Sequence, residues 1–154
     1  MAFREKMLWV SASATLLLWG WYFAHFVTQV RAGSFDQGAA VGNFIMTIVL
    51  LIAVQGIAGI VLAIMSGREA GAPADDREKA FALGGYRVAY FVLASLVVML
   101  MLAGPVLLRI ANEWTPALPP GIAPVLLGNA LLLALVAAEL AHSGYQLFRY
   151  RRGG

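Results

Sequence analysis

The stretch VGNFIMTIVLLIAVQGIAGIVLAIM, residues 41–65, runs for 25 positions without Asp, Glu, Lys or Arg. A helix rises about 1.5 Å per residue, so about 20 apolar residues cross the hydrocarbon core of a bilayer. Lipid offers the backbone no hydrogen-bonding partner, so such a segment must be helical to satisfy its own amide groups. Residues 41–65 are therefore predicted to form a transmembrane helix.

Three further segments have the same character. Residues 7–30 contain no charged side chain, residues 83–108 carry only Arg87 near their start, and residues 122–147 carry only Glu139. The first run is too long for a secretory signal, and no small-residue cleavage site follows it, so we interpret it as an uncleaved anchor. The chain of 154 residues is predicted to be one all-α domain, a bundle of four transmembrane helices.

Basic residues gather on one side of the predicted membrane. The N-terminal segment, the connection at 66–82 and the C-terminal tail hold eight Lys and Arg, whereas the other two connections hold Arg31 and Arg109. Because cytoplasmic flanks are enriched in these residues, we expect both termini in the cytoplasm. Nine of the eleven basic residues are Arg, which is typical of a GC-rich genome. We therefore expect a multi-pass protein of a bacterial cytoplasmic (inner) membrane.

The composition argues against several classes of function. Cysteine is absent, which excludes thiol redox chemistry, disulfides, zinc–thiolate sites and iron–sulfur sites. The sequence shows no phosphate-binding loop, no metal-ligand cluster and no nucleophile beside a base, so no catalytic, metal or cofactor site is expected. A pI near 9.6 without a nucleic-acid-binding motif reflects basic membrane flanks rather than a nucleic-acid partner.

Several polar residues fall inside the predicted spans, where ionisable groups are costly. Helical rise places Arg87 about 13 Å and Glu139 about 7 Å inward of the midplane, close enough for long side chains to pair. Glu139, His142 and Gln146 share one stripe of the fourth helix. We predict a cytoplasm-facing polar cluster of Arg87, Tyr90, Glu139, His142 and Gln146. The simpler alternative is an ion pair that only fixes the packing of the third and fourth helices.

Metal sites built on the histidines do not fit the spacing. His25 and His142 are separated by about 20 Å, so they cannot share a metal ion or a haem within one chain. Glu139 and His142 have the Glu-x-x-His spacing of di-iron bundles, but those sites need further carboxylates and no other acidic residue lies in a span. Each histidine is therefore predicted to be a hydrogen-bonded packing residue.

Small residues follow one amide side chain in the second span. Gln55 lies near mid-membrane and is followed by Gly56 and Gly59. Small residues let helices approach closely, and an amide can hydrogen-bond across the contact. We expect a packing seam here, either within the bundle or in a homo-oligomer; a substrate site at Gln55 is the alternative.

The predicted cytoplasmic surface combines a loop and a basic tail. The loop, residues 66–82, should begin irregularly, and Asp75 with Glu78 three positions later fits a capping box that starts the third helix. Basic side chains in this region favour contact with anionic lipid or a cytoplasmic protein partner. The candidate contact residues are Arg77, Lys79, Arg149, Arg151 and Arg152.

The two halves share short similarities that suggest a repeated helical hairpin. Arg-Glu-Lys precedes the first span at residues 4–6 and the third at 77–79, and Gly-Asn occurs at 42–43 and 128–129. Both halves would start on the same side, so the repeat would be parallel. Chance matching of common residues is the alternative.

The stretch Asp75-Asp76-Arg77-Glu78-Lys79, with Gly85-Tyr86-Arg87-Val88-Ala89-Tyr90 entering the third span, resembles a family of uncharacterised small four-span membrane proteins of bacteria and archaea. These proteins carry an acidic-Arg-acidic loop and an Arg-x-Ala-Tyr-like helix entry. Asp76 stands where many members have Glu. The resemblance implies a four-helix membrane fold and no catalytic residue. Some members are encoded beside helix-turn-helix regulators, so the resemblance also implies a signalling or sequestering role.

Two functions follow as hypotheses from different classes. The first is a non-enzymatic accessory or regulatory membrane protein that acts through its cytoplasmic loop and basic tail. The alternative is a small oligomeric transporter or channel that uses Glu139 inside the membrane, because an intramembrane carboxylate is by default a functional candidate.

Overall fold

The computed structural model consists of four long α-helices and one short 3-10 helix. It describes residues 3–111, 113, 118 and 121–152. Each α-helix is long and apolar enough to span a membrane, and the predicted spans lie within them except for Ile122, which directly precedes the fourth. The prediction of an all-α fold with four transmembrane helices is confirmed. The elements are α1 (Phe3–Arg31), α2 (Gln37–Ser66), η1 (Gly67–Gly71), α3 (Asp76–Ala111) and α4 (Ala123–Arg152).

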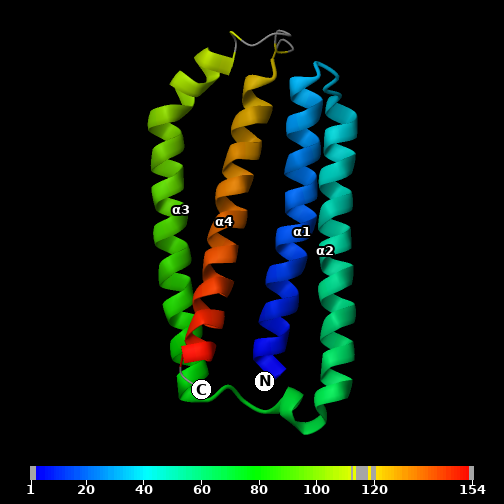
Figure 1. Cartoon of the computed structure of the whole chain (residues 1–154), viewed down its shortest axis with the longest axis vertical. Coiled ribbons are helices and arrows are strands. Elements are labelled where there is room, and N and C mark those ends of the chain that lie inside the picture. The colour runs from blue at the N-terminus through cyan, green and yellow to red at the C-terminus, as the bar shows by residue number, and fades with distance from the viewer. Residues whose placement is uncertain (1–2, 112, 114–117, 119–120, 153–154) are drawn as a thin grey trace.

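The four α-helices lie side by side in the order α3, α4, α1, α2 (Figure 1). Within the described part of the chain, α3 packs on α4, α4 on α1 and α1 on α2, while α2 and α3 do not touch. The bundle is therefore open, with α2 and α3 at its edges. The hairpins α1–α2 and α3–α4 meet through the central helices α1 and α4.

This order bears on the predicted repeat. A two-fold axis along the membrane normal would place equivalent helices of the two hairpins at the centre, either α1 with α3 or α2 with α4. The central pair is α1 with α4. The hairpins are therefore not related by such an axis, and the duplication itself stays a prediction.

Aromatic side chains fill the seam between α1, α2 and α4. Trp19 and Tyr22 of α1 and Val136 of α4 are buried together, and the Trp19 ring centroid lies 5.5 Å from Tyr22 and 5.9 Å from Phe44 of α2. The Tyr22 hydroxyl donates a 2.8 Å hydrogen bond to Oδ1 of Asn129 on α4. Since lipid removes the hydrophobic driving force between helices, this van der Waals packing and the interhelical hydrogen bond hold the two hairpins together.

Two adjacent glycines bring α3 and α4 into close contact. A Cβ atom on Gly84 would lie 2.6 Å from the Tyr145 ring, and one on Gly85 would lie 2.7 Å from Nδ1 and 3.1 Å from the carbonyl oxygen of His142. A side chain at either position would therefore require the atoms of Tyr145 or His142 to shift. The pair therefore sets both the separation and the rotation of α3 against α4.

The start of α1, the end of α4 and the connection between α2 and α3 lie together at one end of the helix axes, at the bottom of Figure 1, and we call this the terminal end. The predicted capping box is confirmed: the Glu78 amide donates to Oδ1 of Asp75 at 2.6 Å, and the Asp75 amide donates to Oε2 of Glu78 at 3.2 Å. The loop was predicted to begin irregularly, but residues 67–71 form the 3-10 helix η1. The helix α3 thus begins well before its apolar segment.

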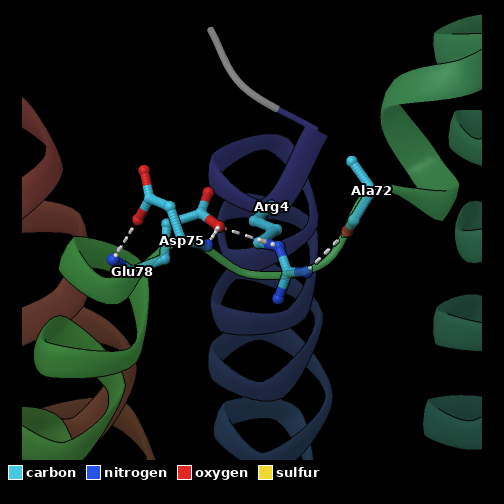
Figure 2. A network of polar contacts seen from close by, with 4 residues as sticks. All are labelled: Arg4, Ala72, Asp75 and Glu78. Carbon is cyan, nitrogen blue, oxygen red and sulfur yellow. Dashed lines mark hydrogen bonds and ion pairs between the residues drawn. The ribbon is translucent and has the colours of Figure 1, made fainter.

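The same connection is tied to the first helix by one arginine (Figure 2). Nε of Arg4 lies 3.2 Å from Oε2 of Glu78, and an Arg4 terminal nitrogen donates to the carbonyl oxygen of Ala72 at 3.0 Å. Glu78 therefore serves both as a helix cap and as the ion-pair partner that links the two hairpins.

At the opposite end, Asp36 caps α2 by accepting a 2.6 Å hydrogen bond from the Ala39 amide. Helix α3 continues past Pro105 to Ala111. The prolines of the predicted outer loop, Pro116, Pro119 and Pro120, lie outside the described residues.

Candidate functional site

A cavity of about 590 Å³ is lined by side chains from all four α-helices. This volume falls within the range of about 300–1,000 Å³ that is typical of small-molecule sites. Because α2 and α3 both line the cavity but do not touch, no helix of the chain closes it on that side. The lining residues are Ser11, Thr15 and Trp19 of α1, Leu51 and Gln55 of α2, Tyr86, Ala89, Tyr90 and Leu93 of α3, and Leu132, Leu135, Val136, Ala138 and Glu139 of α4.

Glu139 is the charged side chain among these lining residues. It is exposed and makes no ion pair or hydrogen bond with any described residue. At a helical rise of about 1.5 Å per residue, Glu139 lies about 7 Å from the middle of the 122–147 span. An acidic group at this depth without a protein partner is the most unusual chemical feature of the cavity.

Arg87 does not pair with Glu139, so the ion pair expected from the sequence is not formed among the described residues. The reason is helical rotation. Tyr86, Tyr90 and Leu93 of α3 follow the spacing of one helix face and line the cavity, and Arg87 lies about 100° around the helix from Tyr86. Arg87 is exposed outside the cavity lining.

The rest of the predicted polar cluster divides into two neighbouring groups. Tyr90 and Glu139 line the cavity, while His142 and Gln146 are hydrogen-bonded to each other, with 2.7 Å between Nε2 of each. The ring of Tyr86, a cavity residue, packs on His142 with centroids 4.3 Å apart. His142 Nδ1 is buried beside the backbone of α3 and has no hydrogen-bond partner among the described residues. His142 thus packs against a residue of the cavity wall without lining the cavity itself.

Gln55 lies where α2 meets α1, at the edge of the same cavity. Its side-chain amide donates a 3.2 Å hydrogen bond to the Ser11 hydroxyl. Gly59 also faces α1, since a Cβ there would be 3.6 Å from Cε of Met7. Gly56 is exposed and has nothing within 4 Å of a Cβ position. The structure therefore brings Gln55 and Gly59, but not Gly56, to the α1–α2 contact.

A second cavity of about 310 Å³ lies between α1, α2 and α4, toward the opposite end. Tyr22, Phe44 and Asn129 line it, and Leu132 lines both cavities. The aromatic cluster of Trp19, Tyr22 and Phe44 stands between the two spaces, because Trp19 lines the first and the other two line the second. The cavities are thus arranged along the bundle with an aromatic barrier between them.

The basic residues predicted to contact a partner or lipid make intramolecular contacts as well. The guanidinium carbons of Arg77 and Arg149 lie 5.4 and 5.1 Å from the centroid of Phe81, and that of Arg151 lies 5.1 Å from Trp9. These are cation–π distances. Lys79 pairs with Asp76 at 3.0 Å, and Arg152 lies 4.5 Å from the Phe148 ring. All five basic side chains remain exposed at the terminal end.

Tyr150 packs among these groups, with its ring 5.3 Å from that of Phe81. Burial raises the pKa of the Tyr150 phenol above its usual value of 10.0, and the nearby negative charge of Glu78 raises this pKa further. The terminal end is thus a packed, charged surface rather than a loose tail.

Sequence reasoning missed the aromatic half of the cavity. Neither Trp19 nor Tyr86 belonged to the polar cluster predicted from the sequence, although both line the cavity. The adjacent glycines at 84 and 85 were the available signal, because a Gly-Gly pair at a helix entry indicates a close helix contact.

No family model, curated protein or solved structure matches this chain. What the protein does must therefore be inferred from its own side chains.

Proposed function

We propose that the protein is a small transporter of the bacterial cytoplasmic membrane and that Glu139 binds the transported or coupling cation, a proton included. The observation that carries this proposal is an acidic side chain at membrane depth that lines a cavity and has no partner in the described chain. Of the two functions expected from the sequence, the transporter alternative thereby gains the stronger support.

Charge balance supports this assignment. Placing an ionised carboxylate at the centre of a membrane helix costs roughly 2.5–3.5 kcal/mol on insertion scales. Arg87 would offset that cost if it paired with Glu139, but it does not line the cavity. Either a proton or a cation from outside the chain must therefore compensate Glu139, and exchange between the two is the elementary step of coupled transport.

The two cavities support movement of a solute along the bundle. They share Leu132 and are separated by Trp19, Tyr22 and Phe44. The two hairpins meet at α1 and α4, so rocking of one hairpin against the other changes the separation at this barrier. We propose that such rocking connects the cavities alternately to the two sides.

We further propose that the terminal end faces the cytoplasm, with eight basic residues in its segments against two at the other end. Glu139 then lies in the cytoplasmic half of the membrane. Within the described residues, the edge helices α2 and α3 have large apolar faces that contact no helix of the same chain, so lipid or a second copy of the chain covers them in the bilayer.

The test is charge displacement after a rapid pH change, recorded from proteoliposomes on a solid-supported membrane. Wild-type protein should give a transient current, and Glu139→Gln should abolish it. Arg87→Gln, which alters an ionisable residue outside the cavity, is the matched control and should retain the current. An undiminished current in Glu139→Gln would overturn the proposal.

The second candidate is an accessory or regulatory role at the terminal end. The observation that favours it is five exposed basic side chains on one surface: Arg77, Lys79, Arg149, Arg151 and Arg152. Attraction to anionic lipid is worth about 1 kcal/mol for each basic residue near the surface. If a cytoplasmic protein is recruited instead, reversing the charge of Arg77 and Lys79 should remove it from pull-downs. Charge reversal of Arg109 at the opposite end is the control, and an unchanged set of captured proteins would count against recruitment.

A further inference from the structure

Aromatic rings accompany the carboxylate in the larger cavity. Trp19 lines it from α1, Tyr86 and Tyr90 line it from α3, and Glu139 lines it from α4. Tyr86 and Tyr90 are 65% and 69% exposed, so packing within the chain leaves most of their surface available. The cavity therefore joins one negative charge to aromatic surface that the fold itself does not use.

This combination distinguishes between classes of cation. A small, strongly hydrated metal ion needs several oxygen ligands, as Ca²⁺ takes six to eight. Glu139 is the single carboxylate among the described residues that line the cavity, and the Ser11 hydroxyl accepts a hydrogen bond from Gln55. A cation whose charge is spread over organic groups needs no such shell, because aromatic faces attract it through their quadrupoles.

The apolar lining and the volume fit the same class. Leu51, Leu93 and Leu135 complete the wall, so most of a bound molecule would contact hydrocarbon. About 590 Å³ accommodates a drug-sized molecule rather than a bare ion. The absence of contact between α2 and α3 leaves the cavity uncovered on one side, which gives a lipid-dissolved molecule a direct path to Glu139.

We propose that this cavity binds a lipophilic organic cation, with its charge against Glu139 and its apolar groups against Tyr86 and Tyr90. The inference rests on the proposed function, in which Glu139 is the cation-binding group, and adds the chemical class of the ligand. An organic anion of the same shape is excluded by the carboxylate. The probe of choice is tetraphenylphosphonium, a monovalent cation with four aromatic groups.

The experiment measures binding of radiolabelled tetraphenylphosphonium to the full chain in lipid nanodiscs. We expect saturable binding to the wild type that unlabelled tetraphenylphosphonium displaces and tetraphenylborate, an anion of similar shape, does not. Glu139→Gln should weaken binding at least tenfold. Glu113→Gln, at the opposite end and outside the cavity lining, is the matched control and should bind as the wild type does.

A second pair of variants tests the aromatic contribution without touching the charge. Tyr90→Leu should weaken binding roughly 2- to 30-fold, the range of measured cation–π contributions, whereas Tyr90→Phe keeps the ring and should bind nearly as the wild type does. Circular dichroism of each variant confirms that the helices are retained.

The outcomes separate this inference from the proposed function. Absence of saturable binding to the wild type, or equal binding to Glu139→Gln, overturns the organic-cation site. If that happens while the pH-jump current still depends on Glu139, the transporter proposal stands with a different cation. Equal loss in Tyr90→Leu and Tyr90→Phe would overturn the role of the ring. Glu139-dependent binding without any current would support the site and contradict transport.

Discussion

The close contact at Gly85 makes a sharp prediction about stability. A Cβ added there would lie 2.7 Å from Nδ1, 3.1 Å from Cε1 and 3.1 Å from the carbonyl oxygen of His142. The ring could turn away, but the carbonyl belongs to the backbone of α4 and moves only if the helix moves. Gly85→Ala should therefore force α3 and α4 apart.

The size of the effect follows from two opposing contributions. Overpacking costs about 1–3 kcal/mol, while replacing Gly by Ala inside a helix gains about 1 kcal/mol of helix propensity. Gly144→Ala on α4 is the matched control, because nothing lies within 4 Å of its Cβ position and it gains only propensity. The difference between the two variants isolates the overpacking cost, so Gly85→Ala should be less stable than Gly144→Ala by about 1–3 kcal/mol.

The assay is reversible unfolding in mixed micelles, followed by circular dichroism as the denaturing detergent is increased. Gly84→Ala should fall between the other variants, because the atoms it meets belong to the end of the Tyr145 side chain, which can rotate. If Gly85→Ala is as stable as Gly144→Ala, the close approach of α3 and α4 is refuted, and with it the rotation that turns Arg87 out of the cavity.

Three further predictions concern the terminal end. Asp75→Ala should lower the free energy of unfolding by about 0.5–2 kcal/mol and speed hydrogen exchange in the first turn of α3. Asp75→Asn, whose side chain is also a good helix cap, should do neither, and equal effects of the two substitutions would contradict the cap. Arg4→Ala should change stability by less than about 1 kcal/mol, since the pair with Glu78 is partly exposed, yet trypsin should cleave the α2–α3 connection faster than in a Lys6→Ala control. An absorbance titration should show Tyr150 ionising above pH 10.0, because its pKa is raised in the folded chain. The unfolded chain then loses this proton first, so stability should fall as pH rises from the unfolded pKa through the folded pKa, and Tyr150→Phe should remove that component.

Much of the fold could be predicted because lipid imposes simple rules. The length of each apolar run predicts a helix that spans the membrane. The Asp75–Glu78 spacing predicts where the third helix starts, because that start depends on local hydrogen bonds alone. Both features are local in the chain, so neither needs knowledge of neighbouring helices.

The lateral order of the helices was beyond this reasoning. Residues 41–65 are apolar apart from isolated polar side chains such as Gln55, so no continuous polar stripe of α2 indicates which face meets a neighbour. The direction of Arg87 was missed for a related reason. The rotation of α3 is set by Gly84 and Gly85 against Tyr145 and His142, a contact between residues about sixty positions apart. Depth alone placed Arg87 near Glu139, but rotation decides whether they meet.

The contact between Glu139 and a bound cation can be measured by infrared difference spectroscopy of the protein in lipid, recorded with and without tetraphenylphosphonium. We expect binding to perturb a carboxyl or carboxylate band in the wild type and to leave this region unchanged in Glu139→Gln. Bands that do not change on binding, or that change equally in Glu139→Gln, would show that Glu139 does not bind the cation.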